Sequence, residues 1–302
     1  MNTKVSIAGK TFKNPILTAS GTFASGQEYA QFVNLNRLGG VITKGVANMA
    51  WEGNPSPRIA EVYGGMLNSV GLQNPGVDRF IKRDLPFLQN YDTRVIVNVC
   101  GKSVFDYLEV VERLNDQPVD MLEINISCPN VTQGGIAFGQ APKMAEHITK
   151  EIRRKSTHPI VMKLSPNVTD ITEMAKAVEA AGADAVSLIN TLTGMKIHVR
   201  SRTFALANKT GGLSGPAIHP VAVRMVYEAS HAVEIPVIGM GGVMNAEDAL
   251  ELMLAGATAV AVGTASFANP TAVTDIINDI RQFMVEEGIQ DINEMIGAVH
   301  ES

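Results

Sequence analysis

A chain of 302 residues with 45% hydrophobic and 18% charged residues can build a large core, which excludes a disordered or fibrous protein. Its 25 basic and 30 acidic residues give a formal net charge of -5 at pH 7, so nucleic acid is not an expected partner. The sequence lacks a secretion signal and any run of about 18 apolar residues, which predicts a cytoplasmic chain without a membrane span. Two cysteines, Cys100 and Cys128, are too few for a disulfide framework or a four-cysteine metal site.

Short apolar runs alternate with segments of helical periodicity along the whole chain. The runs that predict strands lie at 15–19, 41–44, 95–99, 121–126, 160–164, 185–189, 236–239 and 259–262. The segments that predict helices lie at 28–38, 77–89, 105–115, 143–155, 171–181, 220–232, 246–255 and 271–287. Repeated strand–helix pairs imply parallel strands with right-handed crossovers, and about 250 residues plus insertions is the usual size of a (β/α)8 barrel. We therefore predict an α/β TIM barrel as one domain over residues 1–302, with an open doubly wound sheet as the alternative.

Local signals mark helix starts and the N-terminal segment. Asp170 and Asn245 stand at N-cap positions, and each has an acidic residue three positions later, Glu173 and Asp248. Residues 5–12 alternate around a turn, which predicts a small hairpin that closes the N-terminal end of the barrel.

Three predicted strand-to-helix connections, at 45–76, 127–142 and 190–216, are far longer than the usual two to six residues. They are rich in Gly, Asn, Ser and Pro. Because each follows a strand, all three lie on the C-terminal face of the barrel, where enzymes of this fold hold their active sites. These long loops are the predicted location of the functional site.

Polar residues interrupt the apolar strand at 121–126. Alternation puts Glu123 and Asn125 on the face opposite its apolar residues, so Asn125 is expected to project into the upper bore of the barrel. Cys128 and Asn130 follow at the rim. A free cysteine is most often an inert small apolar side chain, but a position beside polar loop residues is partly open and favours reactivity.

Two lysines end otherwise apolar strands. A lysine at a strand end is usually solvated, but burying Lys44 and Lys163 is costly unless each meets an anion, so an anionic ligand in the bore is predicted. Asn98 and Asn190 occupy similar strand-end positions.

Glycines follow the last two predicted strands. The stretch at 239–243 is not a dinucleotide fingerprint, because Met244 replaces its final glycine. Backbone amides at Gly241, Gly242, Gly263 and Thr264 are instead predicted to bind a phosphate, as barrels often do after strands 7 and 8, although these glycines could serve only tight turns. The six histidines show no metal-ligand spacing, so no metal is predicted.

Taken together, many short motifs in one order resemble a known family, class 1 dihydroorotate dehydrogenase, almost from end to end. They are ASGTF at 19–23, TKG at 43–45, NSVGLQNPG at 68–76, NISCPN at 125–130, KLSPN at 163–167, INT at 189–191, GLSGPA at 212–217, GMGGV at 239–243 and VGTA at 262–265. The resemblance implies an FMN-containing barrel that oxidises (S)-dihydroorotate to orotate in the synthesis of pyrimidines.

The resemblance also implies roles for particular residues. Cys128 would remove the proton from carbon 5 of dihydroorotate while a hydride leaves carbon 6 for flavin N5, and Lys163 would offset the charge of the reduced flavin. The expected substrate-binding residues are Lys44, Asn68, Ser69, Val70, Gly71, Leu72, Asn125, Asn130, Asn190 and Thr191. The expected FMN-binding residues are Ser20, Lys44, Gly45, Asn98, Asn125, Lys163, Ile189, Gly215, Gly241, Gly242, Gly263 and Thr264.

Within the class, the stretches at 61–76 and 130–139 resemble the NAD-linked branch, class 1B. This implies a homodimer of this chain joined to a subunit with FAD and a 2Fe-2S cluster, in a heterotetramer, since two cysteines here cannot ligate such a cluster. A fumarate-linked class 1A enzyme and a relative of dihydropyrimidine dehydrogenase remain alternatives. A non-redox alternative is an aldolase in which Lys163 forms a Schiff base.

Overall fold

A closed barrel of eight parallel strands forms the centre of the computed structural model, which describes residues 1–127 and 139–300. In their order around the barrel the strands are β3 (Ile16–Thr18), β4 (Gly40–Ile42), β7 (Arg94–Val99), β8 (Met121–Asn125), β9 (Ile160–Lys163), β10 (Ala185–Leu188), β15 (Val237–Met240) and β16 (Ala259–Val262). Strand β16 pairs with β3 and closes the ring. The predicted (β/α)8 barrel is therefore confirmed, and the open sheet is wrong.

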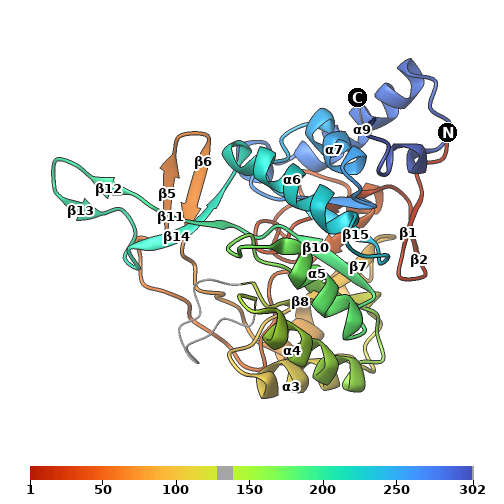
Figure 1. Ribbon diagram of the computed structural model, residues 1–302. Coiled ribbons are helices and arrows are strands. Elements are labelled where there is room, and N and C mark those ends of the chain that lie inside the picture. Colours follow the sequence, from red (N-terminus) through yellow and green to blue (C-terminus); the bar gives the residue numbers. More distant parts are fainter. Residues whose placement is uncertain (128–138, 301–302) are drawn as a thin grey trace.

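Helices surround the barrel and bury their apolar faces against it (Figure 1). They are α1 (Val77–Arg79), the π-type segment η2 (Phe80–Asp84), α2 (Leu85–Leu88), α3 (Val104–Leu114), α4 (Pro142–Lys155), α5 (Ile171–Ala180), α6 (His219–Ser230), α7 (Ala246–Leu254), α8 (Ala265–Ala268) and α9 (Ala272–Glu286). Short 3-10 turns are η1 (Leu35–Arg37), η3 (Pro216–Ile218) and η4 (Ile292–Met295). No helix in the described ranges combines the length and the apolarity that crossing a membrane requires.

Both predicted N-caps are confirmed. The Asp170 side chain accepts hydrogen bonds from the backbone of the first turn of α5, and Asn245 forms a capping box with Asp248 at the start of α7. Such caps satisfy amide groups that have no partner inside the helix.

The helix predicted at 28–38 is wrong, because only the short η1 turn forms there. Gly26, with φ of +89°, bends the chain just before this segment. Phe23 is fully buried, and its ring stacks on Tyr29 with 4.3 Å between centroids. Packing of these two rings onto the barrel holds the segment in successive turns, so its apolar residues reflect burial and not helical periodicity.

The predicted N-terminal hairpin is present as β1 (Val5–Ile7) and β2 (Lys10–Phe12), an antiparallel pair. Arg94, the first residue of β7, donates a hydrogen bond to the carbonyl oxygen of Thr11 at 2.9 Å. The hairpin therefore lies at the N-terminal end of the barrel strands, with Phe12 buried in the core.

Two of the long connections form a second sheet that the sequence did not predict. Its strands, in order, are β11 (Leu192–Met195), β14 (Thr210–Ser214), β6 (Gly65–Asn68) and β5 (Ile59–Val62), and we call this set the rim sheet. A small hairpin of β12 (Ile197–His198) and β13 (Thr203–Phe204) extends from it. Figure 1 shows both projecting from the barrel. The connections at 45–76 and 190–216 are thus joined through backbone pairing, with Asn68 opposite Gly212.

Candidate active site

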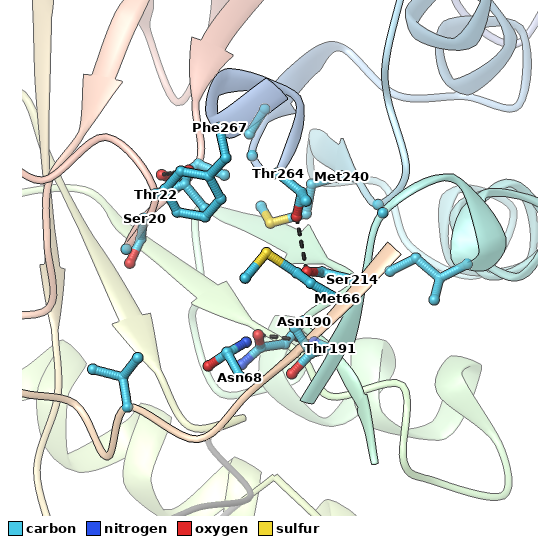
Figure 2. A pocket seen from close by; sticks show the side chains of 18 of the residues that line it. Ser20, Thr22, Met66, Asn68, Asn190, Thr191, Ser214, Met240, Thr264 and Phe267 are labelled. Carbon is cyan, nitrogen blue, oxygen red and sulfur yellow. Dashed lines mark hydrogen bonds between the residues drawn. The ribbon is translucent and has the colours of Figure 1, made fainter. Parts of the chain in front are cut away.

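A cavity of about 600 Å³ lies at the carboxyl ends of the barrel strands, where the rim sheet forms part of its wall (Figure 2). Most of the sequence-predicted site residues line it. They are Ser20, Lys44, Gly45, Asn68, Val70, Gly71, Leu72, Asn125, Lys163, Ile189, Asn190, Thr191, Gly215, Gly241, Gly242, Gly263 and Thr264. Residues separated by up to 244 positions in the chain are therefore brought together around one space.

Two predicted residues that the structure describes, Ser69 and Asn98, are not among the residues that line this cavity. Ser69 is buried and its hydroxyl accepts a hydrogen bond from Asn54 at 3.1 Å. Asn98 is fully buried, with its Oδ1 close to Gly45 of the wall. Cys128 and Asn130 lie outside the described residues.

One end of the cavity is built from glycines and hydroxyl side chains. We call it the glycine end, and it consists of Ser214, Gly215, Gly241, Gly242, Gly263 and Thr264. Gly242 has φ of +73°, and a Cβ there would lie 2.7 Å from the Cβ of His219, so no side chain fits. The Thr264 hydroxyl donates to the Ser214 hydroxyl at 2.8 Å, as Figure 2 shows. Backbone and hydroxyl groups without bulky side chains suit a phosphate.

His219 supports this end from behind. Its Nδ1 donates to the carbonyl oxygen of Gly241 at 2.8 Å, and its Nε2 lies 3.0 Å from a carboxylate oxygen of Glu251. With Asp248, these residues bring three possible metal-ligand atoms within 4.8 Å of one another. The sequence analysis missed this cluster because His219 and the two acids come from different helices, α6 and α7.

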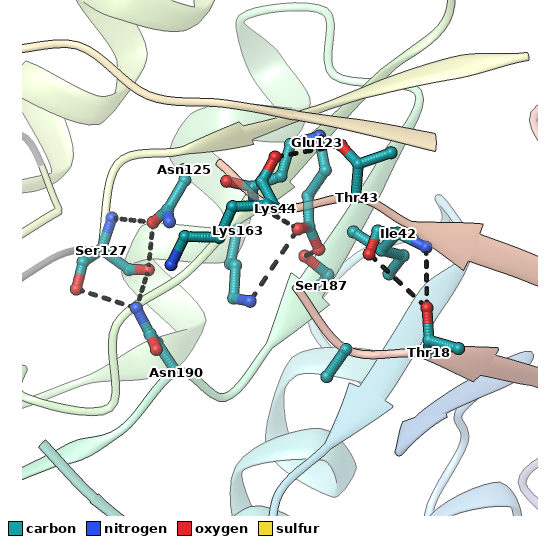
Figure 3. Close-up of polar contacts among 12 residues, drawn as sticks. Thr18, Ile42, Thr43, Lys44, Glu123, Asn125, Ser127, Lys163, Ser187 and Asn190 are labelled. Atoms are coloured by element: carbon teal, nitrogen blue, oxygen red, sulfur yellow. Dashed lines mark hydrogen bonds and ion pairs between the residues drawn. The ribbon is translucent and has the colours of Figure 1, made fainter. Parts of the chain in front are cut away.

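The opposite end of the cavity presents amide and lysine side chains. We call it the amide end, and it consists of Lys44, Asn68, Asn125, Lys163, Asn190 and Thr191. The Asn125 Oδ1 accepts from the Ser127 hydroxyl at 2.9 Å, and the Asn190 Nδ2 donates to that same hydroxyl at 2.7 Å (Figure 3). Ser127 thus fixes both amides. It was missed by the sequence analysis, although its place two residues after Asn125 was a usable signal.

A buried ionic network lies beneath the amide end. Lys163 is only 4% exposed, and its Nζ lies 3.8 Å from Oε2 of Glu123, which is fully buried. The Glu123 carboxylate accepts a hydrogen bond from Asn98 Nδ2 at 2.5 Å. It accepts another from the Ser187 hydroxyl at 2.8 Å (Figure 3). The sequence-based argument that Lys163 needs an anionic ligand is therefore corrected, because the chain itself supplies an anion.

Apolar side chains that the sequence analysis did not name complete the wall. Met66, Met240 and Phe267 also line the cavity (Figure 2). Met66 and Met240 lie within strands and Phe267 lies in a short helix, where an apolar residue looks like ordinary core in a single sequence, so no pattern identified them.

Comparisons with known proteins identify the family of this chain. A family model described as dihydroorotate dehydrogenase matches residues 2–284. A curated protein of Lachnoclostridium phytofermentans named dihydroorotate dehydrogenase B (NAD(+)), catalytic subunit, is 66% identical over 99% of this chain and 100% of its own length. Proteins of the same name from Alkaliphilus metalliredigens and Geobacter metallireducens are 58% and 55% identical, over 99% and 98% of this chain and 99% and 97% of their own lengths. The chain therefore belongs to the dihydroorotate dehydrogenase family.

Proposed function

We propose that this chain is the catalytic subunit of an NAD-linked dihydroorotate dehydrogenase, and that residues 1–302 act as one FMN-binding domain. It oxidises (S)-dihydroorotate to orotate in pyrimidine synthesis. The observation that carries this proposal is the single cavity with a glycine end for a phosphate and an amide end for a pyrimidine.

The residues present fit FMN. Asn98 Oδ1 is buried and has no hydrogen-bond partner among the described residues. A Cβ placed on Gly45, which lines the cavity, would lie 3.1 Å from this oxygen, so the acceptor lies directly behind the wall at a position without a side chain. A flavin ring carries one N–H group, which such an acceptor suits. The glycine end would hold its phosphate, and when bound, FMN accepts the electron pair that dihydroorotate loses.

The amide end fits the substrate. A pyrimidine presents alternating N–H and C=O groups, and an asparagine can donate and accept at once, so Asn68, Asn125 and Asn190 suit such a ring. Lys44 would bind the substrate carboxylate. Asn130 is proposed to complete this set.

Cys128 is proposed as the base that takes the proton from carbon 5. It directly follows Ser127, which contacts both Asn125 and Asn190. The aldolase alternative is disfavoured because Lys163 faces Glu123, and an ammonium group paired with a carboxylate is not a nucleophile.

The electron acceptor is proposed to be NAD, reached through a partner subunit. The relatives are named as NAD(+) enzymes and as catalytic subunits. This chain has only two cysteines and no dinucleotide fingerprint, so we propose a homodimer that joins an FAD and 2Fe-2S subunit in a heterotetramer.

An anaerobic absorbance spectrum tests the proposal. The purified chain should carry about one FMN, and dihydroorotate should bleach it. Cys128→Ala should keep its flavin but slow bleaching by about 10² to 10⁴, the usual contribution of a general base. Cys100→Ala is the control, because Cys100 is buried and is not among the lining residues. A protein that binds no FMN, or that bleaches at the normal rate without Cys128, contradicts the proposal.

Stopped-flow oxidation by NAD tests the partner. The reduced chain alone should react slowly with NAD and rapidly once the FAD and 2Fe-2S subunit is added. Rapid reaction of the isolated chain would contradict the need for a partner, and fast turnover with fumarate would place it in the other branch.

A further inference from the structure

Glu123 belongs to no role assigned so far, yet it is the fully buried carboxylate at the centre of the network below the cavity. We propose that Glu123 is a positioning residue that sets both the orientation of the Asn98 amide and the net charge beneath the flavin. The inference rests on the proposed FMN site.

The first effect concerns the Asn98 amide. An ionised carboxylate only accepts hydrogen bonds, so the group that faces Glu123 at 2.5 Å must be the Nδ2 of Asn98. The amide oxygen then has to point the other way, toward the space left by Gly45. The register of the barrel enforces this arrangement, because Asn98 on β7 lies directly opposite Glu123 on β8. Glu123 therefore makes Asn98 present an acceptor, and not a donor, to the cofactor.

The second effect concerns charge. Lys163 lines the cavity, and its ammonium group lies 3.8 Å from Glu123. Lys163 alone would place a full positive charge beside the flavin. The buried carboxylate offsets it, and at low dielectric this compensation is large. Loss of the carboxylate charge should therefore make reduction of the bound flavin more favourable, because reduction adds electrons next to an unbalanced cation.

A substitution at Ser187 distinguishes this role of Glu123 from an ordinary packing role. Its hydroxyl donates to the other carboxylate oxygen of Glu123, at 2.8 Å, and it is equally buried. Removing that hydroxyl leaves the carboxylate charge and the Asn98 contact in place. Ser187→Ala is therefore a matched control within the same network.

The test measures two quantities, the dissociation constant of FMN and the reduction potential of the bound flavin. Glu123→Gln should weaken FMN binding about tenfold, since a carboxamide can face Asn98 with its oxygen or with its NH2 group and no longer fixes the orientation of the Asn98 amide. It should also shift the reduction equilibrium toward the reduced flavin by tenfold or more, which is about 30 mV upward for two electrons. Glu123→Asp keeps the charge but shortens the side chain, so it should weaken FMN binding while the potential stays near that of the wild type. Ser187→Ala should change each equilibrium by less than about threefold.

The outcomes separate the two proposals. Wild-type protein that binds no FMN refutes the proposed function, and this inference falls with it. Wild-type protein that binds FMN, together with a folded Glu123→Gln variant of unchanged affinity and potential, refutes only the role of Glu123. The role of Glu123 is also refuted if Ser187→Ala shifts the affinity and the potential as much as Glu123→Gln does. It is refuted as well if the potential of Glu123→Asp moves as far as that of Glu123→Gln. If Glu123→Gln does not fold, the Asp variant carries the test by its loss of affinity at constant potential.

Discussion

The two ends of the cavity are built by different physical means. At the glycine end the chain removes side chains, and Gly241 and Gly242 at positive φ bring the backbone itself to the wall. At the amide end the chain adds side chains and then fixes them, as Ser127 fixes Asn125 and Asn190. The first end depends on shape, and the second depends on hydrogen-bond direction and charge. Substitutions at the two ends should therefore reduce stability or ligand binding for different physical reasons.

The largest expected effect is at the amide end. Lys163→Met keeps the side-chain volume but leaves the Glu123 carboxylate without its cation, so it should lower the free energy of unfolding by about 3–5 kcal/mol. Urea unfolding without FMN measures this. The control is Lys155→Met, whose ion pair with Glu112 is solvent-exposed and should matter little. Equal losses in the two variants would show that burial of the pair is unimportant.

Substitution of a glycine at the glycine end should lower stability through steric conflict. Gly242→Ala combines positive φ with a Cβ 2.7 Å from that of His219, so about 1–2 kcal/mol of strain adds to about 1–3 kcal/mol of overpacking. FMN should then raise the melting temperature less than it does in the wild type. Gly9→Ala is a close control, because Gly9 has φ of +74° and nothing within 4 Å of the added Cβ. If both variants lose the same stability, packing at the glycine end is not the cause of the loss.

Asn190→Ala should act on ligand binding more than on folding. It removes an amide that lines the cavity and is proposed to pair with the pyrimidine, and a ligand polar group left unpaired there costs about 1–3 kcal/mol, so orotate should bind roughly ten- to a hundredfold more weakly. Calorimetric titration measures this affinity. Asn167→Ala is the control, because Asn167 bonds to the backbone oxygen of Thr191 but is not a lining residue. A comparable loss of orotate affinity in the control would mean that Asn190 has no direct role.

The smallest effect is expected for Thr264→Val. This change keeps the shape and removes one neutral hydrogen bond to Ser214, so FMN binding should weaken by only about 0.5–1.5 kcal/mol. A double-mutant cycle with Ser214→Ala isolates the contact. Strictly additive effects would indicate that the two hydroxyls act independently on the phosphate.

The barrel could be predicted because its strands are buried on both faces. Strand β8, for example, is buried at every position, and it reads as an apolar run with two polar interruptions. The rim sheet could not be predicted in this way. Along β5 exposed and half-buried residues alternate, so no core-facing side gives a signal, and the next strand, β6, pairs with β14 from a distant part of the chain.

The candidate site shows the same division. Alternation placed Glu123 on the polar face of its strand, together with Asn125. Its partners Asn98, Lys163 and Ser187 stand on three other strands, β7, β9 and β10. Which polar residues of a barrel meet in one layer depends on the stagger between neighbouring strands, and periodicity within one strand does not contain that information.

Pairing in the rim sheet also limits how the length of this chain can vary. Asn68 reaches the cavity because it lies opposite Gly212, in a register shared by β6 and β14. Deleting one residue within β6 would turn every following side chain to the other face of the sheet. The turn between β5 and β6, where Tyr63 is fully exposed, can accept extra residues without this penalty. Homologous chains should therefore differ in length at this turn and conserve the spacing from Gly65 to Asn68.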